Sequence, residues 1–255
     1  MSIAIVTGAS SGIGAAFARK LATKPEVDAL WLVARRTERL KSLADELGKP
    51  CTCISADLAS EAGLARVEGE LIEEQPDVAY LVNAAGFGKI GTWETIDAAD
   101  NDAMIDLNCR AMVHLTTSTL PYMRAGSHVF EVVSCAAFTP LPHMNVYAAS
   151  KAFMQSYTRG LRWEIRGRGI CATAVCPSWV KTEFTTVAKQ SRGGADIGHF
   201  PFAQKPSTVA TRAIAASNFH FAIATCGLPS FFLRVVGKFF PHCITMAGWE
   251  AFRRV

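Results

Sequence analysis

The stretch Ile3-Ala4-Ile5-Val6-Thr7-Gly8-Ala9-Ser10-Ser11-Gly12-Ile13-Gly14 decides the fold of this chain. It opens with an apolar run typical of a strand buried on both faces, and a helical stretch begins directly after it. Between them, Gly8 allows a tight turn, Gly12 lets the backbone approach an anion, and Gly14 permits close helix-strand packing. A helix N-terminus behind such a turn cradles a phosphate. The stretch therefore predicts a dinucleotide site rather than an ordinary tight turn.

Length and composition restrict the class of protein further. The chain has 255 residues, half of them hydrophobic, and a net charge of +4. This length can bury a large core and is close to the size at which a single α/β domain stops growing, so we expect one domain over residues 1–255. The charge is mild, and basic residues neither form long blocks nor alternate with aromatic ones. We therefore expect no nucleic-acid partner.

Neither a targeting segment nor a metal site is expected. Residues 1–7 already fit a strand and show no charged and then apolar leader, which favours a cytoplasmic protein. Cys51 and Cys53 are separated by one residue, whereas zinc and redox pairs use a spacer of two. We expect the eight cysteines to be small buried hydrophobic residues.

The second predicted strand, Ala29–Ala34, is followed by Arg35 and Arg36. In a dinucleotide site the end of this strand meets the adenosine ribose, where a carboxylate would bind the 2′-hydroxyl and an arginine suits a 2′-phosphate. The two arginines and the missing carboxylate predict NADP(H) rather than NAD(H). The alternative is that both arginines are simply solvated. A helix is expected from Thr37 to Leu47, with Thr37 as its N-cap.

The remaining pattern alternates strands and helices, as in a doubly wound sheet. Asp57 follows the third strand, where the adenine edge lies in such a fold, and Ser60 is expected to cap a helix that runs to Gln75. The small residues of Asn83-Ala84-Ala85-Gly86 follow the fourth strand and allow a cofactor to approach. We expect strands at Cys51–Ser55, Val78–Val82, Val129–Val133, Cys171–Cys176 and Phe219–Ala224, and helices at about 101–123, 147–166 and 207–217.

Tyr147 and Lys151 stand four residues apart in a stretch that favours helix, so their side chains should share one face. A free tyrosine has a pKa of about 10, and lowering it by roughly three units to suit neutral pH requires about 4 kcal/mol. A neighbouring ammonium supplies part of this by favouring the phenolate. Ser134, at the end of the preceding strand, can return to the phenol and complete an acid/base cluster. By itself, such a pair also fits a packed tyrosine beside a solvated lysine.

Several motifs in order resemble the short-chain dehydrogenase/reductase family over roughly the first seven-tenths of the chain. They are Thr7-Gly8-Ala9-Ser10-Ser11-Gly12-Ile13-Gly14, Asp57-Leu58, Asn83-Ala84-Ala85-Gly86, Asn108, Ser134, Tyr147-Ala148-Ala149-Ser150-Lys151 and Pro177-x-x-x-x-Thr182. The resemblance implies an α/β protein with a three-layer, doubly wound Rossmann fold, a seven-stranded parallel sheet and a nicotinamide cofactor. The family usually has glycine where this chain has Ser178, a departure that can alter the backbone near the nicotinamide.

By this resemblance, four residues are catalytic. Tyr147 is the general acid/base, and Lys151 lowers its pKa and holds the nicotinamide ribose. Ser134 orients the substrate oxygen, and Asn108 anchors a water-linked proton path. The residues expected to bind the cofactor are Gly8, Ser10, Ser11, Gly12, Ile13, Gly14, Arg35, Arg36, Asp57, Leu58, Asn83, Ala84, Gly86, Tyr147, Lys151, Pro177, Val180 and Thr182.

These roles predict an enzyme that transfers hydride between NADP(H) and a carbonyl or alcohol carbon. The substrate pocket is expected to contain Phe87, Ser134, Phe138, His143, Tyr147, Trp179 and Phe184. This mostly apolar lining favours a lipophilic ketone, aldehyde or alcohol over a sugar, and His143 is expected to be a loop residue rather than a catalytic group. The rival interpretation is a catalytically silent NADP(H)-sensing or scaffold protein on the same fold.

The chain beyond these motifs divides into a lid and a tail. Residues 183–205 are rich in glycine, serine and polar residues and predict a mobile substrate lid. In the tail, residues 228–255, pairs of apolar residues recur every four positions with basic residues between them, which predicts an apolar helix that stops at Pro241. It is too short and too charged to span a bilayer. Three interpretations stay open: packing over the substrate pocket or a neighbouring subunit, a peripheral membrane contact, or a loosely ordered tail.

The resemblance also implies self-association. In this family the helices expected at 101–123 and 147–166 pair with those of a second subunit, so we expect a homodimer or homotetramer. Apolar residues that suit such a contact are Leu107, Ala111, Phe153 and Leu161. Each of them also fits an ordinary core position.

Overall fold

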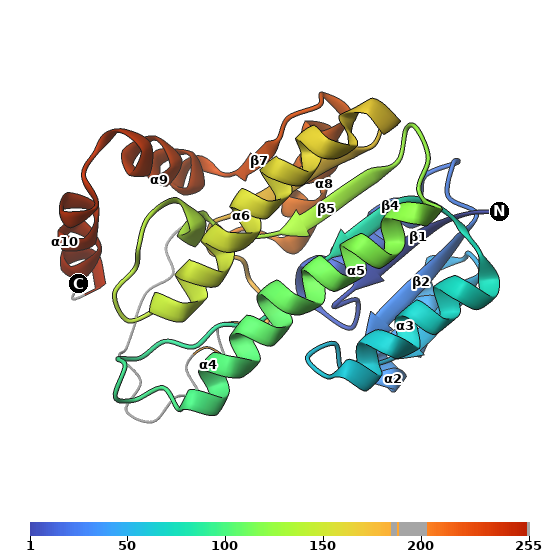
Figure 1. The fold of residues 1–255 in the computed structure, drawn as a ribbon, viewed down its shortest axis with the longest axis horizontal. Helices are drawn as coiled ribbons and strands as arrows, with labels where there is room; N and C mark the ends of the chain where they lie inside the picture. Colours follow the sequence, from blue (N-terminus) through green and yellow to red (C-terminus); the bar gives the residue numbers. More distant parts are fainter. Residues whose placement is uncertain (185–187, 189–202, 254–255) are drawn as a thin grey trace.

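The computed structural model describes residues 1–184, 188 and 203–253, and in this part of the chain seven parallel strands form one sheet (Figure 1). The strand order is β3-β2-β1-β4-β5-β6-β7, and every neighbouring pair is parallel. The strands are β1 Ser2–Thr7, β2 Ala29–Ala34, β3 Cys51–Ser55, β4 Asp77–Asn83, β5 His128–Val132, β6 Cys171–Pro177 and β7 Ile223–Cys226. The predicted seven-stranded Rossmann-type sheet is confirmed.

Helices cover both faces of this sheet. They are α1 Gly12–Ala22, α2 Thr37–Leu47, α3 Glu61–Glu74, α4 Ala98–Ile105, α5 Ala111–Thr119, α6 Asn145–Ile165, α8 Pro206–Asn218, α9 Leu228–Phe239 and α10 His242–Arg253. One hydrophobic core lies between the sheet and α1, α2 and α8, and another lies between the sheet and α3, α5 and α6 (Figure 1). Alternation along β1 serves both cores, because Ala4 and Val6 enter the first while Ile3 and Ile5 enter the second. The unbroken apolar run of β1 is therefore required by burial on both faces.

The winding of the chain reverses between β1 and β4, so the helices that follow these strands diverge and leave a crevice at their carboxyl ends. Two glycines allow the backbones to meet there. Gly8 has φ +63°, and a Cβ on it would lie 2.8 Å from the backbone of Ala84. A Cβ on Gly14 would lie 2.4 Å from the carbonyl oxygen of Gly8. The glycine turn, the end of β4 and the start of α1 can therefore pack together only without side chains between them.

One of the two predicted helix caps is confirmed and the other is wrong. Ser60 caps α3, because its Oγ accepts a hydrogen bond from the Gly63 amide at 3.0 Å. Thr37 instead is the first residue of α2, and Arg36 occupies the cap position. The Thr37 hydroxyl donates to Ser55 Oγ at 2.9 Å. It therefore ties α2 to β3 and does not cap the helix.

The long helix predicted at about 101–123 is interrupted in the middle. It consists of α4, a π segment η1 (Asp106–Arg110), α5, and a 3-10 segment η2 (Leu120–Tyr122). A π segment holds an extra residue in one turn and often occurs at functional sites. Asn108 lies within it and is buried.

The last predicted strand, Phe219–Ala224, begins too early. Residues 219–221 instead close the C-terminal turn of α8: the His220 amide donates to Ser217 O and the Phe221 amide to Ala216 O, both at 2.8 Å. His220 has φ +56°, which a strand cannot contain. β7 starts at Ile223, and Phe219 and Phe221 are exposed.

The tail forms two helices where the sequence predicted one. α9 matches the expected apolar helix before Pro241, and α10 follows it after a sharp turn (Figure 1). In the described part of the chain, no helix combines the length and the apolar character needed to cross a membrane. The interpretation as a loosely ordered tail is wrong for residues 228–253, since they are helical and make defined contacts with the rest of the chain.

The cysteines of the described residues make no disulfide, and four of them are buried. Cys243 differs from the expectation of buried thiols because it lies exposed on α10. No group of three or more His, Cys, Asp and Glu side chains suited to a metal ion occurs within residues 1–184, 188 and 203–253. The described cysteines therefore serve mainly as small packing residues.

Two glycines of α3 provide a matched test of this packing. A Cβ on Gly63 would lie 1.9 Å from Asp57 O, whereas a Cβ on Gly69 would meet nothing within 4 Å. We expect Gly63→Ala to lower the free energy of unfolding by about 1–3 kcal/mol, since helix and loop must move apart. Gly69→Ala should raise it by about 0.5–1 kcal/mol through helix propensity. Urea unfolding of both variants measures the difference, and equal effects would contradict the packing described here.

Candidate active site

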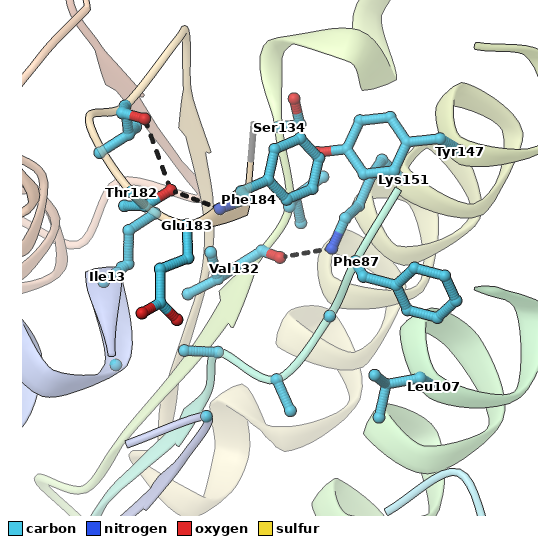
Figure 2. A pocket seen from close by; sticks show the side chains of 18 of the residues that line it. Ile13, Phe87, Leu107, Val132, Ser134, Tyr147, Lys151, Thr182, Glu183 and Phe184 are labelled. Carbon is cyan, nitrogen blue, oxygen red and sulfur yellow. Dashed lines mark hydrogen bonds between the residues drawn. The ribbon is translucent and has the colours of Figure 1, made fainter. Parts of the chain in front are cut away.

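A cavity of about 690 Å³ follows the carboxyl ends of the central strands. Ile13 of the glycine turn lies on one side of this cavity, and Tyr147 and Phe87 lie on the other (Figure 2). Every residue predicted to bind the cofactor, with the exception of Asn83, lines this cavity. The motifs that are scattered along the sequence are therefore brought together in one cleft.

The shape of the cavity fits a dinucleotide. Its floor is bare backbone at Gly12, where φ is +57° and a Cβ would lie 3.1 Å from the Thr182 side chain. It is equally narrow at Gly86, where a Cβ would lie 2.9 Å from Asn108 Oδ1 and 3.3 Å from Lys151 Nζ. The N-terminus of α1 opens into the same space, and the side chain of its N-cap Ser11 makes no capping hydrogen bond. Backbone amides at such a helix start suit a pyrophosphate.

Arg36 forms an anion-binding corner beside the glycine turn. Its guanidinium donates to Ser10 Oγ at 3.0 and 3.2 Å and to Ser11 Oγ at 2.9 Å. It also donates to Glu183 Oε2 at 2.7 Å, while Arg39 donates to Glu183 Oε1 at 2.5 Å. The hydrogen bonds from Arg39 and Arg36 hold the pKa of Glu183 at about 2. Two guanidinium groups that bind a carboxylate can bind another oxyanion, so the corner suits a 2′-phosphate when Glu183 moves aside.

Of the residues in this anion-binding corner, the sequence predicted Arg36 but neither Arg39 nor Glu183. Arg35 is more open than Arg36 and lies 4.0 Å from Asp57, measured from Nη1 to Oδ2. Arg39 and Glu183 were not expected to take part. Arg39 lies in the first turn of α2, three residues after the N-cap Arg36, a spacing that could have indicated it. Glu183 gave no signal, because it reaches Arg36 across 147 positions of sequence.

Ser134, Tyr147 and Lys151 meet near the other end of the cavity (Figure 2). Tyr147 and Lys151 lie one turn apart on α6, and Lys151 Nζ is 5.8 Å from the centre of the phenol ring. Lys151 Nζ also donates to Val132 O at 2.9 Å, which ties α6 to β5. Ser134 Oγ accepts from the Ala136 amide at 3.1 Å, and the Ser134 side chain acts to lower the pKa of Tyr147. The predicted acid/base cluster is therefore assembled in space.

The expected acidity of Tyr147 is not found. Burial raises the pKa of Tyr147 above its ordinary value, and the hydrogen bond with Ser134 offsets only part of this. Burial likewise lowers the pKa of Lys151 to about 8. The sequence-based prediction weighed the attraction between phenolate and ammonium but not the cost of removing both charges from water. At these buried side chains the second effect is larger.

Asn108 holds the site together from behind. Its Oδ1 accepts from the Phe87 amide at 3.1 Å, and its Nδ2 donates to Phe87 O at 2.9 Å and to Ser150 Oγ at 3.1 Å. It is buried and does not line the cavity. Asn108 therefore fixes the chain after β4 against the helix that carries Tyr147, and its part in a proton path stays a prediction.

Asn83 does not reach the cavity with its side chain, contrary to its prediction as a cofactor residue. Its Nδ2 donates to Thr116 Oγ1 at 2.8 Å and to Glu131 Oε1 at 3.0 Å. The side chain points to the face of the sheet that α5 covers, where it is fully buried. It therefore joins β4 to α5 and β5 beneath the site.

Five of the seven predicted substrate residues line the cavity: Phe87, Ser134, Tyr147, Trp179 and Phe184. Phe138 and His143 do not. A Cβ on Gly237 would lie 2.2 Å from Phe138 O, so the backbone of α9 packs directly on this residue. His143 Nε2 lies 3.3 Å from Glu250 Oε1, which binds it to α10. His143 is therefore a structural loop residue, and both corrections come from the tail.

The tail contributes to the substrate end of the cavity, which the sequence did not indicate by residue. Leu233 of α9 and Trp249 of α10 line it. The Trp249 indole donates to Pro142 O at 2.8 Å, and Ser230 Oγ donates to Cys176 O at 2.6 Å. Of the three interpretations of the tail, packing over the substrate pocket therefore agrees with the side that carries Leu233 and Trp249. The predicted lid at 183–205 lies mostly outside the described residues.

Ser178 causes no backbone strain at the position where the family usually has glycine. Among the described residues other than glycine, positive φ occurs at Gln75, His143 and His220. The Ser178 hydroxyl accepts a hydrogen bond from Gln204 Nε2 at 2.8 Å. The serine is thus accommodated beside β6 without backbone strain.

The fold and the cavity define an α/β dinucleotide-binding protein, and comparisons with known proteins refine this class. A family model described as "short chain dehydrogenase" matches residues 2–193. Sulfoacetaldehyde reductase 2 of Chromohalobacter salexigens is 39% identical over 194 residues, covering 72% of this chain and 75% of that protein. Serine 3-dehydrogenase of Agrobacterium fabrum is 34% identical over 189 residues, covering 72% and 74%.

Solved structures agree. A short-chain dehydrogenase from Sphingobium yanoikuyae in complex with NADPH has a TM-score of 0.80 at 27% identity and covers 93% of both chains. The bulky-bulky ketone specific alcohol dehydrogenase from Comamonas testosteroni has a TM-score of 0.75 at 26% identity, covering 89% of this chain and 87% of that one. This chain belongs to the short-chain dehydrogenase/reductase family, whose members are oxidoreductases acting on CH–OH and C=O groups.

The arginine corner gives a test of cofactor choice. We expect Arg36→Ala to weaken NADPH binding by about tenfold or more, because it removes a charge-assisted contact worth about 1.5–3 kcal/mol, and to leave NADH binding nearly unchanged. Fluorescence titration with both cofactors measures this. Arg124→Ala, which removes a guanidinium paired with Asp77 outside the lining of the cavity, is the control. An equal loss for NADPH and NADH would contradict the assignment of this corner to the 2′-phosphate.

Proposed function

We propose that this protein is an NADP(H)-dependent oxidoreductase that transfers hydride between the nicotinamide and a carbonyl or alcohol carbon of a lipophilic small molecule. The observation that carries the proposal is the convergence of Ser134, Tyr147 and Lys151 in a cavity whose other end holds Arg36. NADP(H), when bound, supplies or accepts the hydride. The chain supplies a binding cleft, oriented hydrogen bonds and a proton.

In the direction of reduction, the hydroxyls of Ser134 and Tyr147 bind the carbonyl oxygen and Tyr147 donates its proton as negative charge develops there. The raised pKa of Tyr147 fits this role, because the phenol is protonated at neutral pH. Lys151, with a pKa of about 8, still carries its proton at pH 7 and can meet the charge left on the phenolate. In the proposed reduction, the proton donor Tyr147 and the positive charge of Lys151 are therefore in position before the reaction begins.

The proposed substrate class follows from the walls of the cavity. Around Tyr147 the walls are apolar or aromatic, and the residues concerned are Phe87, Leu107, Leu141, Met144, Trp179, Phe184, Leu233 and Trp249. Lys89 also lines this region, but its ammonium lies 3.2 Å from Asp100. Such walls favour a bulky lipophilic ketone, aldehyde or alcohol. The similarity to a ketone-specific alcohol dehydrogenase supports this choice, whereas the similarity to a sulfoacetaldehyde reductase points to a smaller, charged aldehyde.

A substrate panel tests both the activity and its class. We expect NADPH oxidation with bulky aryl or alicyclic ketones at a kcat/KM at least tenfold above that for sulfoacetaldehyde, since the walls around Tyr147 are mainly apolar and the Lys89 ammonium is already paired with Asp100. A higher kcat/KM for sulfoacetaldehyde would refute the lipophilic substrate class but would still agree with an oxidoreductase. Absence of turnover across the panel, with NADPH still bound, would favour the catalytically silent sensor or scaffold.

Tyr147→Phe tests the mechanism itself. The variant lacks the proton donor but keeps the ring that packs on Phe184, with centroids 5.4 Å apart. We expect turnover to fall by at least about 10³-fold while the NADPH dissociation constant changes by less than threefold. Tyr122→Phe, on η2, is the control and should retain full activity. If Tyr147→Phe turned over near the wild-type rate, Tyr147 would not be the proton donor.

We also propose that the protein forms at least a dimer. Large apolar side chains are exposed along the outer face of α4 and α6, namely Ile105, Phe153 and Trp163. Their position agrees with the subunit contact that the family resemblance implies. Leu107 lines the cavity instead, and Ala111 and Leu161 are buried core residues, so these three do not belong to such a contact. Light scattering of the purified protein measures the mass.

A peripheral membrane contact is a second proposal for the tail, favoured by its outer face. Exposed apolar residues gather on α9 and the turn after it: Leu228, Phe231, Phe232, Phe239 and Phe240. Arg234 and Lys238 lie among them, and the sequence from 228 to 249 contains no acidic residue. An apolar face with a basic flank is complementary to an anionic bilayer surface. Because the inner face of the same helix lines the pocket, such a surface would lie beside the entry of a lipophilic substrate.

Paired serine variants test this contact. We expect Phe231→Ser with Phe232→Ser to reduce co-sedimentation with phosphatidylserine-containing vesicles by at least about tenfold, since burying each phenyl ring contributes roughly 1.5–3 kcal/mol. Phe219→Ser with Phe221→Ser is the matched control, because these rings are equally exposed at the end of α8. Equal binding of both double variants would exclude α9 as the membrane contact.

A further inference from the structure

Glu131 is a fully buried carboxyl directly beneath the active site. It lies in β5, next to Val132, whose carbonyl accepts the hydrogen bond from Lys151. Its Oε1 accepts from Thr116 Oγ1 at 2.6 Å and from Asn83 Nδ2 at 3.0 Å. Within the described residues, Glu131 Oε2 has no hydrogen-bond partner. A half-satisfied buried acid is costly, and an apolar residue of similar volume is often at least as stable at such a position.

Among the residues that the structure describes, Lys151 is the cation that acts on Glu131. β4 and α5 contribute the neutral Asn83 and Thr116, and β6 places Ala174 beside it in the sheet. α6 contributes two titratable groups that interact with it electrostatically, Lys151 and the phenol of Tyr157. Burial raises the pKa of Glu131 to about 7, and the hydrogen bonds and Lys151 act against this rise. Above neutral pH the group is therefore a buried anion on the same side of the sheet as Lys151.

Lys151 in turn needs a negative neighbour. Burial is the main effect on its pKa, which it lowers, while Cys109, Glu131 and Cys176 act to raise it. The pKa of the Cys176 thiol is raised to about 12 and that of Cys109 is also raised, so both thiols are neutral near pH 8. Of these three groups, Glu131 is the one that carries negative charge at that pH. The Glu131 carboxylate therefore favours the charged form of Lys151.

We propose that Glu131 is a positioning residue of the reaction: its carboxylate keeps the Lys151 ammonium charged, and Lys151 passes this effect on to the phenolate of Tyr147. The inference rests on the proposed roles of Tyr147 and Lys151. It explains why a polar network occupies the space between β4, β5 and α5. Glu131 touches neither substrate nor cofactor, since it does not line the cavity.

A purely structural role is the competing explanation. The Glu131 carboxyl also cross-links β4 and α5 through Asn83 and Thr116, so its loss would lower stability in either case. Only the electrostatic role predicts a change in the pH dependence of catalysis. Lys151 has to be protonated to stabilise the phenolate, so the alkaline limb of kcat/KM for reduction follows its titration. Removal of a nearby negative charge lowers that pKa and moves the limb to lower pH.

The decisive variant is Glu131→Gln, which keeps an oxygen for Thr116 and Asn83 but carries no charge. We expect the alkaline limb of kcat/KM to move down by about one pH unit. Tyr157→Phe removes a neighbouring phenol that is uncharged near pH 8 and leaves the Glu131 carboxylate with both of its hydrogen bonds, so its limb should stay in place. A lower melting temperature of Glu131→Gln with an unshifted limb would overturn the proposal. Failure of the proposed function would appear separately, as turnover retained by Tyr147→Phe.

A second measurement does not require Glu131→Gln to fold. Coupling between two titrating groups is reciprocal, so Lys151→Met should raise the pKa of the buried carboxyl. Difference infrared spectroscopy follows the carboxylic acid C=O band, which should persist to a pH about one unit higher in Lys151→Met than in the wild-type protein. An unchanged titration of this band would overturn the proposal.

Discussion

The structure depends on the close approach of three backbone segments at the crossover between β1 and β4. Gly8 and Gly14 allow the turn, the end of β4 and the start of α1 to meet without side chains, and this contact fixes the floor of the cleft. Everything that recognises the cofactor is placed relative to that floor. The arginine corner lies on the next strand outward on one side, and the acid/base cluster lies on the strand and helix that follow on the other.

Much of the fold and most of the site could be predicted from local sequence, for physical reasons. Strands buried on both faces need continuous apolar runs, and a glycine turn before a helix has few other uses, so β1 and the cofactor cleft were correctly expected. Alternation of apolar and polar residues cannot separate a strand from the last turn of a helix, which is why β7 was placed too early. His143, Phe138 and Asn83 failed for another reason. Their side chains are held by partners far away in sequence, such as Glu250 for His143.

The electrostatics of the site also exceed what residue spacing can indicate. A tyrosine and a lysine one turn apart predict mutual stabilisation, but burial raises the pKa of the first and lowers that of the second. Anionic partners lie at both ends of the cleft: Glu183 against Arg36 and Arg39, and Glu131 beneath Lys151. Neither carboxylate belongs to a motif. These two carboxylates, which no local sequence pattern marks, thus interact with the cations that we propose to act in cofactor binding and proton transfer.

The π segment Asp106–Arg110 contains one residue more than a regular helix would hold over the same rise. Loss of a single codon there would restore regular α geometry while α4 and α5 keep their orientations, because the π turn takes up the extra residue locally. The side chains within the turn would change direction, and the contacts of Asn108 with Phe87 and Ser150 would be lost. Evolution can therefore exchange residue types in this segment more freely than it can change their number.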